Sequence, residues 1–143
     1  MVTKRFIRRV VASLAVPWML LSSVSPAAGQ QVPPSAARAT PGFEKLKGRW
    51  LRDSGGYTIE IRGVGPGGKL EAAYFNPKSI HVGKAEASQQ GGVLKVLIEL
   101  RDVNYPGSTY TLAYDAKSDR LVGRYFQAVA REAFDVYFVR LKP

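Results

Sequence analysis

The feature of this sequence that most restricts its fold is a series of short segments of alternating side-chain character, each ended by residues typical of turns. From residue 43 onward, no window of about 12 residues has the apolar stripe of a helix. The breaks contain Gly, Pro, Asn or Asp and are too short for crossover helices, so neighbouring segments should form antiparallel hairpins. The eight expected strands are residues 46–52, 56–62, 69–75, 79–87, 93–101, 108–114, 120–128 and 132–141.

Consecutive hairpins of this kind predict an all-β fold, an eight-stranded antiparallel up-and-down barrel. Closure of the sheet removes the unpaired strand edges that a long open meander would expose. A two-sheet sandwich is the alternative fold, but it usually needs longer Greek-key connections than this sequence provides.

Alternation along each strand predicts which side chains face the interior, because successive residues point to opposite sides of a sheet. In residues 93–101, Lys95 and Glu99 should face water, so the apolar residues between them face inward. The same argument turns five of the seven tyrosines inward. The interior is therefore expected to be unusually rich in phenol groups.

The segment 79–87 can be assigned in two ways. If Lys84 and Glu86 face water, then His81 points into the barrel. A bulge at Gly83 would shift this alternation and change the assignment, since glycine within a strand often marks a bulge.

Four of the five inward tyrosines are expected at one end of the predicted barrel, and Tyr114 at the opposite end. Neighbouring strands run in opposite directions, so the first residues of one strand lie beside the last residues of the next. A pocket with apolar walls and a few convergent polar groups is the usual small-molecule site. The alternative is a filled core, in which tyrosine rings pack inside and their hydroxyls reach water at the rim. The candidate ligand-binding residues are Tyr57, Tyr74, His81, Tyr105, Tyr110, Tyr125 and Gln127.

The beginning of the chain has the pattern of a secretory signal peptide. Four basic residues and no acid are followed by an apolar stretch over 10–24 and by small residues over 25–29. We therefore expect a signal peptide at 1–28, a flexible Pro- and Ala-rich tether at 29–42 and the barrel at 43–143. The mature protein is predicted to be periplasmic or extracellular.

Removal of this leader would reduce the positive charge of the chain. The full sequence has 21 Lys and Arg against 11 Asp and Glu, and the leader holds four of the basic residues, which leaves 17 − 11 = +6. The remaining basic residues are spread along the chain, whereas a nucleic-acid site needs a clustered patch. We expect no nucleic-acid partner, and attraction to an anionic envelope surface stays open.

The residue types that support catalysis and metal binding are scarce. The absence of cysteine excludes disulfides, thiolate nucleophiles and Cys-based metal sites, and a single histidine excludes His-pair sites. Ser79 and His81 could share a strand face, but every strand acid is predicted to point outward and none could orient the pair. The prediction is a non-enzyme without cofactor or metal.

Two local patterns carry a resemblance to a known superfamily. The first predicted strand contains Gly48 and Trp50 in a G-x-W pattern, and Arg140 lies late in the last strand. This arrangement resembles the calycins, the lipocalins and avidins among them, and residues 119–125 are similar to strands of avidin-like barrels. The resemblance implies that Gly48, Trp50 and Arg140 stabilise the closed end of a lipocalin-like barrel. The chain also resembles uncharacterised small secreted bacterial proteins with YFNP and NYPGS segments.

Two functions follow from these expectations. The first is a secreted barrel that binds a small apolar or amphipathic ligand at its tyrosine-lined mouth without catalysis. The alternative is an envelope protein-interaction or adhesion module with a filled barrel and a basic surface. Its contact patch would include Phe75, Phe126 and Tyr137.

Overall fold

The computed structural model describes residues 42–143, which form an antiparallel sheet of nine strands and two short 3-10 helices. The predicted signal peptide at 1–28 and all but the last residue of the predicted tether lie outside the described residues. No helix within residues 42–143 is long and apolar enough to cross a membrane. The elements are η1 (Phe43–Leu46), β1 (Gly48–Arg52), β2 (Thr58–Val64), η2 (Pro66–Gly68), β3 (Leu70–Asn76), β4 (Lys78–Ile80), β5 (Val82–Gln90), β6 (Val93–Asp102), β7 (Tyr105–Asp115), β8 (Arg120–Gln127) and β9 (Glu132–Leu141).

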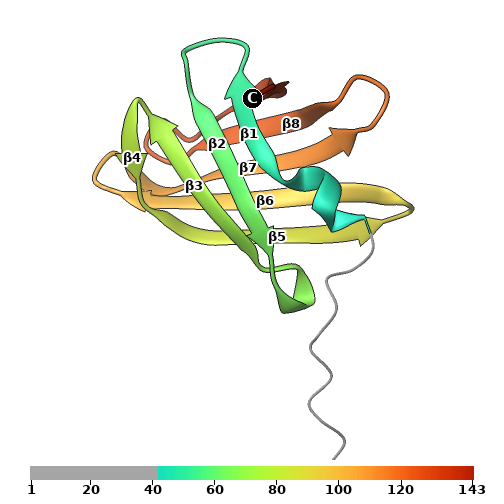
Figure 1. Cartoon of the computed structure of the whole chain (residues 1–143). Helices are drawn as coiled ribbons and strands as arrows, with labels where there is room; N and C mark the ends of the chain where they lie inside the picture. Colours follow the sequence, from blue (N-terminus) through green and yellow to red (C-terminus); the bar gives the residue numbers. More distant parts are fainter. Residues whose placement is uncertain (1–41) are drawn as a thin grey trace, which may run out of the picture. The chain divides into compact units, whose positions relative to one another are not determined.

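The sheet curls into a nearly closed up-and-down barrel (Figure 1), in the order β4-β3-β2-β1-β9-β8-β7-β6-β5. All strand pairs are antiparallel, and the first and last strands, β1 and β9, pair with each other. Within this pair Trp50 lies opposite Arg140, and Arg52 lies opposite Phe138. The expected all-β, up-and-down architecture is thus confirmed.

The number of strands differs from the prediction, because the expected strand 79–87 is broken at His81 into β4 and β5. β4 pairs with β3, β5 pairs with β6, and these two pieces are the edges of the sheet. The β5–β6 register shifts at Gly83, where an added Cβ would lie only 2.4 Å from the Cγ of Arg101. A single bridge between Lys69 and Glu86 links the two sides of the opening. The seam of the barrel therefore falls at the glycine bulge.

Alternation along the long strands confirms the predicted inner rows. In β6, Leu94, Val96, Ile98 and Leu100 are all buried. The largest fully buried side chains are Trp50, Tyr74, Tyr110 and Phe138, which come from β1, β3, β7 and β9. Full burial of an apolar side chain stabilises the fold by about 1.5–3 kcal/mol, so these four side chains supply much of the free energy that favours closure of the barrel.

Candidate functional site

A pocket of about 310 Å³ opens at one end of the barrel. Its lining comes from β1, β3, β7, β8 and β9, from the residue before β2 and from the turn before β7. Six of the seven predicted ligand-binding residues line it, and the lining contains no carboxylate. The full set is Arg52, Tyr57, Tyr74, Asn104, Tyr105, Tyr110, Tyr125, Gln127 and Phe134.

The floor of the pocket is built from buried tyrosines on β3, β7 and β8. The hydroxyls of Tyr74 and Tyr110 lie 2.9 Å apart and share a hydrogen bond, which satisfies two polar groups that burial would otherwise leave unpaired. The rings of Tyr110 and Tyr125 stack with centroids 4.5 Å apart, and Phe138 packs edge-on against Tyr110. The floor tyrosines belong to the same buried cluster as Leu112 and Leu121.

Burial keeps the floor phenols uncharged. It raises the pKa of Tyr110 to about 12, although the hydroxyl of Tyr74 and the positive charge of Arg52 both oppose this shift. Burial also raises the pKa of Tyr74 and of Tyr125. Neutral phenols can both donate and accept hydrogen bonds, so the floor offers a ligand polar contacts without a negative charge.

The rim of the pocket is held by side-chain hydrogen bonds. The amide nitrogen of Asn76 donates to the hydroxyl of Tyr105 over 2.5 Å, and the Tyr105 ring packs edge-on against Tyr74. The carboxylate of Asp102 accepts from the backbone N–H of Val103 and of His81, which ties the turn before β7 to the end of β4. Tyr105 itself starts β7, earlier than the predicted strand start at residue 108. Its aromatic ring is thereby fixed by a strand and not by a free loop.

The expectation that His81 faces the interior is wrong. His81 is exposed, lies between β4 and β5 and does not line the pocket. The bulge at Gly83 causes the difference, since it shifts the alternation so that Ile80 and Val82 pack against the core. Ser79, its proposed partner, is also exposed.

Three lining residues were absent from the predicted set: Arg52, Asn104 and Phe134. Phe134 belongs to the predicted inner row of the last strand, and its ring stacks on Tyr125 with centroids 6.5 Å apart. Alternation from the buried Trp50 also places Arg52 on the inner face of β1, so the sequence did contain a signal for this residue. Asn104 lies in a turn, for which alternation predicts no direction.

The guanidinium of Arg52 lies among aromatic rings. Its carbon is 5.0 Å from the ring centroid of Tyr57 and 5.8 Å from that of Tyr125, both within the range of cation–π attraction. Within residues 42–143, Arg52 forms no salt bridge, and its Nε is buried without a hydrogen-bond partner. The pocket therefore contains a positive charge that the described residues do not neutralise.

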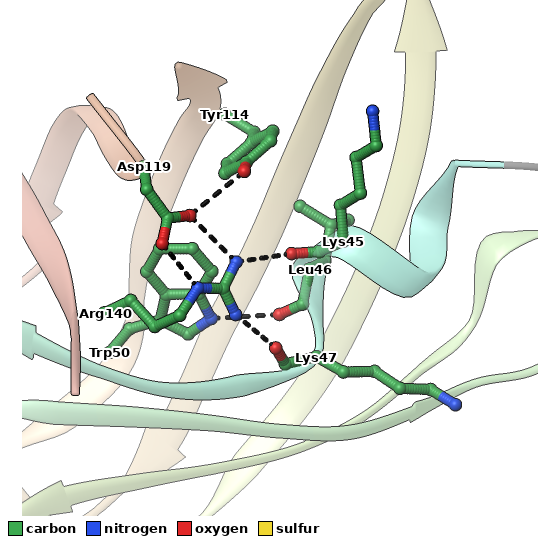
Figure 2. Close-up of polar contacts among 7 residues, drawn as sticks. All are labelled: Lys45, Leu46, Lys47, Trp50, Tyr114, Asp119 and Arg140. Carbon is green, nitrogen blue, oxygen red and sulfur yellow. Dashed lines mark hydrogen bonds and ion pairs between the residues drawn. The ribbon is translucent and has the colours of Figure 1, made fainter. Parts of the chain in front are cut away.

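The opposite end of the barrel holds a second arginine with a full set of partners (Figure 2). Arg140 donates to both carboxylate oxygens of Asp119 and to the carbonyl oxygens of Lys45 and Lys47. Its guanidinium carbon lies 4.0 Å from the ring centroid of Trp50, whose Nε1 donates to the carbonyl of Leu46 over 2.9 Å.

The third residue of the predicted closed-end set, Gly48, lies beside this cluster. Its φ is 134°, and a Cβ there would lie 2.8 Å from Nη1 of Arg140. The structure thus brings Gly48, Trp50 and Arg140 together. Helix η1 contributes the buried Phe43 and Leu46 to the same core.

The mouth pocket combines aromatic walls with a small set of polar groups. Its polar groups are phenols, two amides and one guanidinium. No group of three or more His, Asp or Glu side chains that could hold a metal ion occurs in residues 42–143. Comparisons with family models, curated proteins and solved structures find no match to this chain. The site is therefore interpreted from its own geometry.

Proposed function

We propose that this protein is a non-catalytic barrel that binds a small, partly apolar molecule in the tyrosine-lined mouth pocket. The single observation that carries the proposal is a pocket of about 310 Å³ whose lining includes six of the seven residues in the predicted ligand-binding set. This volume is at the lower end of the usual range of small-molecule sites. Aromatic walls with a few placed polar groups are the typical lining of such sites.

The depth of the pocket supports a small ligand over a long one. The floor tyrosines Tyr74 and Tyr110 are fully buried and joined by their hydroxyls, so a ligand would rest on them. Tyr57 and Tyr105 are only partly buried and stand at the sides. A flat molecule could stack on the side rings and direct a polar end at the phenols or at Gln127.

We further propose that the protein acts outside the cytoplasm, in the periplasm or the extracellular space. The support is the sequence of the first 28 residues, with basic, apolar and small residues in the order of a secretory signal peptide. A binding barrel in that compartment would meet molecules that enter or leave the cell. The leader pattern and the pocket are independent observations, so each can be tested separately.

The adhesion alternative receives less support from the placement of its residues. Phe126 is 42% exposed on β8, and Tyr137 lies on the adjacent β9. Phe75 lies on β3, which β2 and β1 separate from β9, and it is only partly exposed. The three aromatics therefore do not form one continuous patch, which is the feature that marks many interfaces.

A pair of substitutions on adjacent residues of β8 tests the pocket. Gln127 lines the pocket, whereas Phe126 points to the outer face, so Gln127→Trp fills the mouth and Phe126→Trp adds the same side chain outside. The probe is N-phenylnaphthylamine, an uncharged aromatic molecule whose fluorescence rises in apolar sites. We expect wild type and Phe126→Trp to bind it and Gln127→Trp to bind about tenfold more weakly or worse.

The result that would overturn the proposal is equal binding by all three proteins, or failure of the wild type to bind either this dye or its sulfonated analogue anilinonaphthalenesulfonate. Near-UV circular dichroism of each variant serves as the control for folding, because loosely packed states also bind such dyes.

A further inference from the structure

The unpartnered arginine of the mouth distinguishes this pocket from a purely apolar one. Arg52 is partly buried, lines the pocket and carries a buried Nε without a hydrogen-bond partner. A buried polar group without a partner costs free energy, and a charged one costs more. The rings of Tyr57 and Tyr125 reduce this cost, and the nearby phenol of Tyr110 is neutral, so no described residue supplies a negative charge.

Two acidic residues close in sequence to the lining residues Arg52 and Asn104 form no salt bridge with Arg52. Asp53, the next residue in the chain, lines a separate hollow with Val122 and Arg124. Asp102, at the mouth turn, uses its carboxylate oxygens for the backbone N–H of His81 and Val103. The pocket is thus an electropositive cavity with aromatic walls.

The remaining polar groups of the pocket fit a negative ligand as well. The phenol hydroxyls can donate hydrogen bonds, as can the amides of Asn104 and Gln127. A guanidinium adds up to five donors in a planar fork that matches a carboxylate, sulfonate or phosphate group. A cationic ligand would meet repulsion from Arg52 and would find no carboxylate in the lining.

From these observations we propose that the ligand is a small organic anion with a flat apolar body, whose acidic group pairs with Arg52 while its rings lie against Tyr57 and Tyr105. This inference rests on the proposed binding function and deepens it by naming the ligand class. The acidic group supplies the counter-charge that the described residues lack. The apolar body covers the exposed parts of the aromatic walls.

Two dyes that differ only in charge test the inference. Anilinonaphthalenesulfonate has the rings of N-phenylnaphthylamine together with one sulfonate, so it serves as the probe of the anionic class. The test variant is Arg52→Gln, which removes the charge. The matched control is Arg49→Gln, which removes the same charge from an exposed position on the same strand.

We expect wild type and Arg49→Gln to bind the sulfonate dye more tightly than the uncharged dye. In Arg52→Gln the affinity for the sulfonate dye should fall by about tenfold or more, as expected for loss of a charge-assisted hydrogen bond, while binding of the uncharged dye stays the same. An Arg52→Lys variant should retain part of the preference, since it keeps the charge and loses the planar fork.

The failures of the two proposals are distinguishable. If both dyes bind wild type and Arg52→Gln with equal affinity, the anionic class is wrong and the binding pocket stands. If neither dye binds wild type, both proposals are wrong. If Arg52→Gln loses both dyes while its thermal unfolding is unchanged, Arg52 shapes the pocket and does not select charge, which also overturns the inference.

Discussion

At each end of the barrel an arginine lies over an aromatic ring, but only one of the two arginines has a carboxylate partner among the described residues. Arg140, on β9, lies over Trp50 and has Asp119 and two backbone carbonyls as partners. Arg52, on β1, lies over Tyr57 and Tyr125 and forms no salt bridge within residues 42–143. The two strands are paired neighbours, so the contrast arises from local partners and not from different architecture.

We interpret this difference as one between an arginine that stabilises the fold and one that is available to the proposed ligand. A guanidinium whose donors are satisfied by its own chain has little left to offer a ligand, and its removal disturbs the fold. A guanidinium that lines a cavity without an anionic partner contributes little to folding and remains free to bind. The ends of the barrel can therefore be assigned different roles from hydrogen bonds alone.

The largest expected effect is on stability, and it compares the two arginines directly. Arg140→Met removes four side-chain hydrogen bonds and should lower the free energy of unfolding by about 3 kcal/mol. Arg52→Met leaves no carboxylate without its partner, so it should change the free energy of unfolding by less than about 1 kcal/mol. Denaturant unfolding followed by circular dichroism measures both. Equal losses in the two variants would contradict the division between a structural and a binding arginine.

A second prediction uses the effect of Arg52 on the pocket floor at high pH. Burial raises the pKa of Tyr110 to about 12 in the folded protein, above the value of about 10 for an unfolded chain. Its contribution to stability is complete below pH of about 10 and is lost as the pH rises towards about 12, an effect of about 3 kcal/mol.

The same titration compares the two arginines again. The charge of Arg52 favours the ionised form of Tyr110, so Arg52→Met should shift the ionisation of Tyr110 to higher pH. Arg140→Met should leave the ionisation of Tyr110 unchanged and raise the pKa of Tyr114, because Arg140 favours the ionised form of Tyr114 at the other end. The NMR shifts of isotope-labelled tyrosine rings against pH report each phenol separately, and a shift of Tyr110 ionisation in the Arg140 variant would argue against separate ends.

The smallest expected effect concerns the glycine beside Arg140. Gly48→Ala places a Cβ 2.8 Å from Nη1 of Arg140 at a φ of 134°, so it should lower the free energy of unfolding by about 2 kcal/mol. Gly56→Ala is the control, since its φ of 69° is also positive but nothing lies within 4 Å of the new Cβ. It should cost about 1 kcal/mol. Thermal unfolding distinguishes them, and an equal loss would mean that the contact with Arg140 contributes nothing.

The antiparallel fold and its inner rows could be predicted because alternation and turn residues are local signals. Leu94 to Leu100 on β6 and the tyrosines of β3, β7 and β8 follow directly from the period of two. For residues 79–87 the sequence left two assignments open, and the structure shows the one with the bulge at Gly83. This shift of the alternation by one residue places His81 on the surface and not in the predicted interior.

The sequence predicted the tyrosines of the candidate site but not its charged residue, Arg52. Tyr57, Tyr74 and Tyr110 were recognised as a group because phenols on inner rows are conspicuous. Arg52 follows the same alternation from Trp50, but a charged residue at a strand end is usually assigned to solvent. Its lack of a carboxylate partner is a property of the folded chain, which no sequence pattern reports.

The most direct test of the account is the spectrum of the tyrosine rings during binding. The chain has seven tyrosines, of which five line the pocket, while Tyr114 bonds to Asp119 at the other end and Tyr137 lies outside, against Arg120. Selective isotope labelling of tyrosine allows each ring to be followed by NMR as anilinonaphthalenesulfonate is added. The account predicts shifts for Tyr57, Tyr105 and Tyr125 with Tyr114 and Tyr137 unchanged. Shifts confined to Tyr114 or Tyr137, or no shift at saturating dye, would contradict a binding site at the mouth.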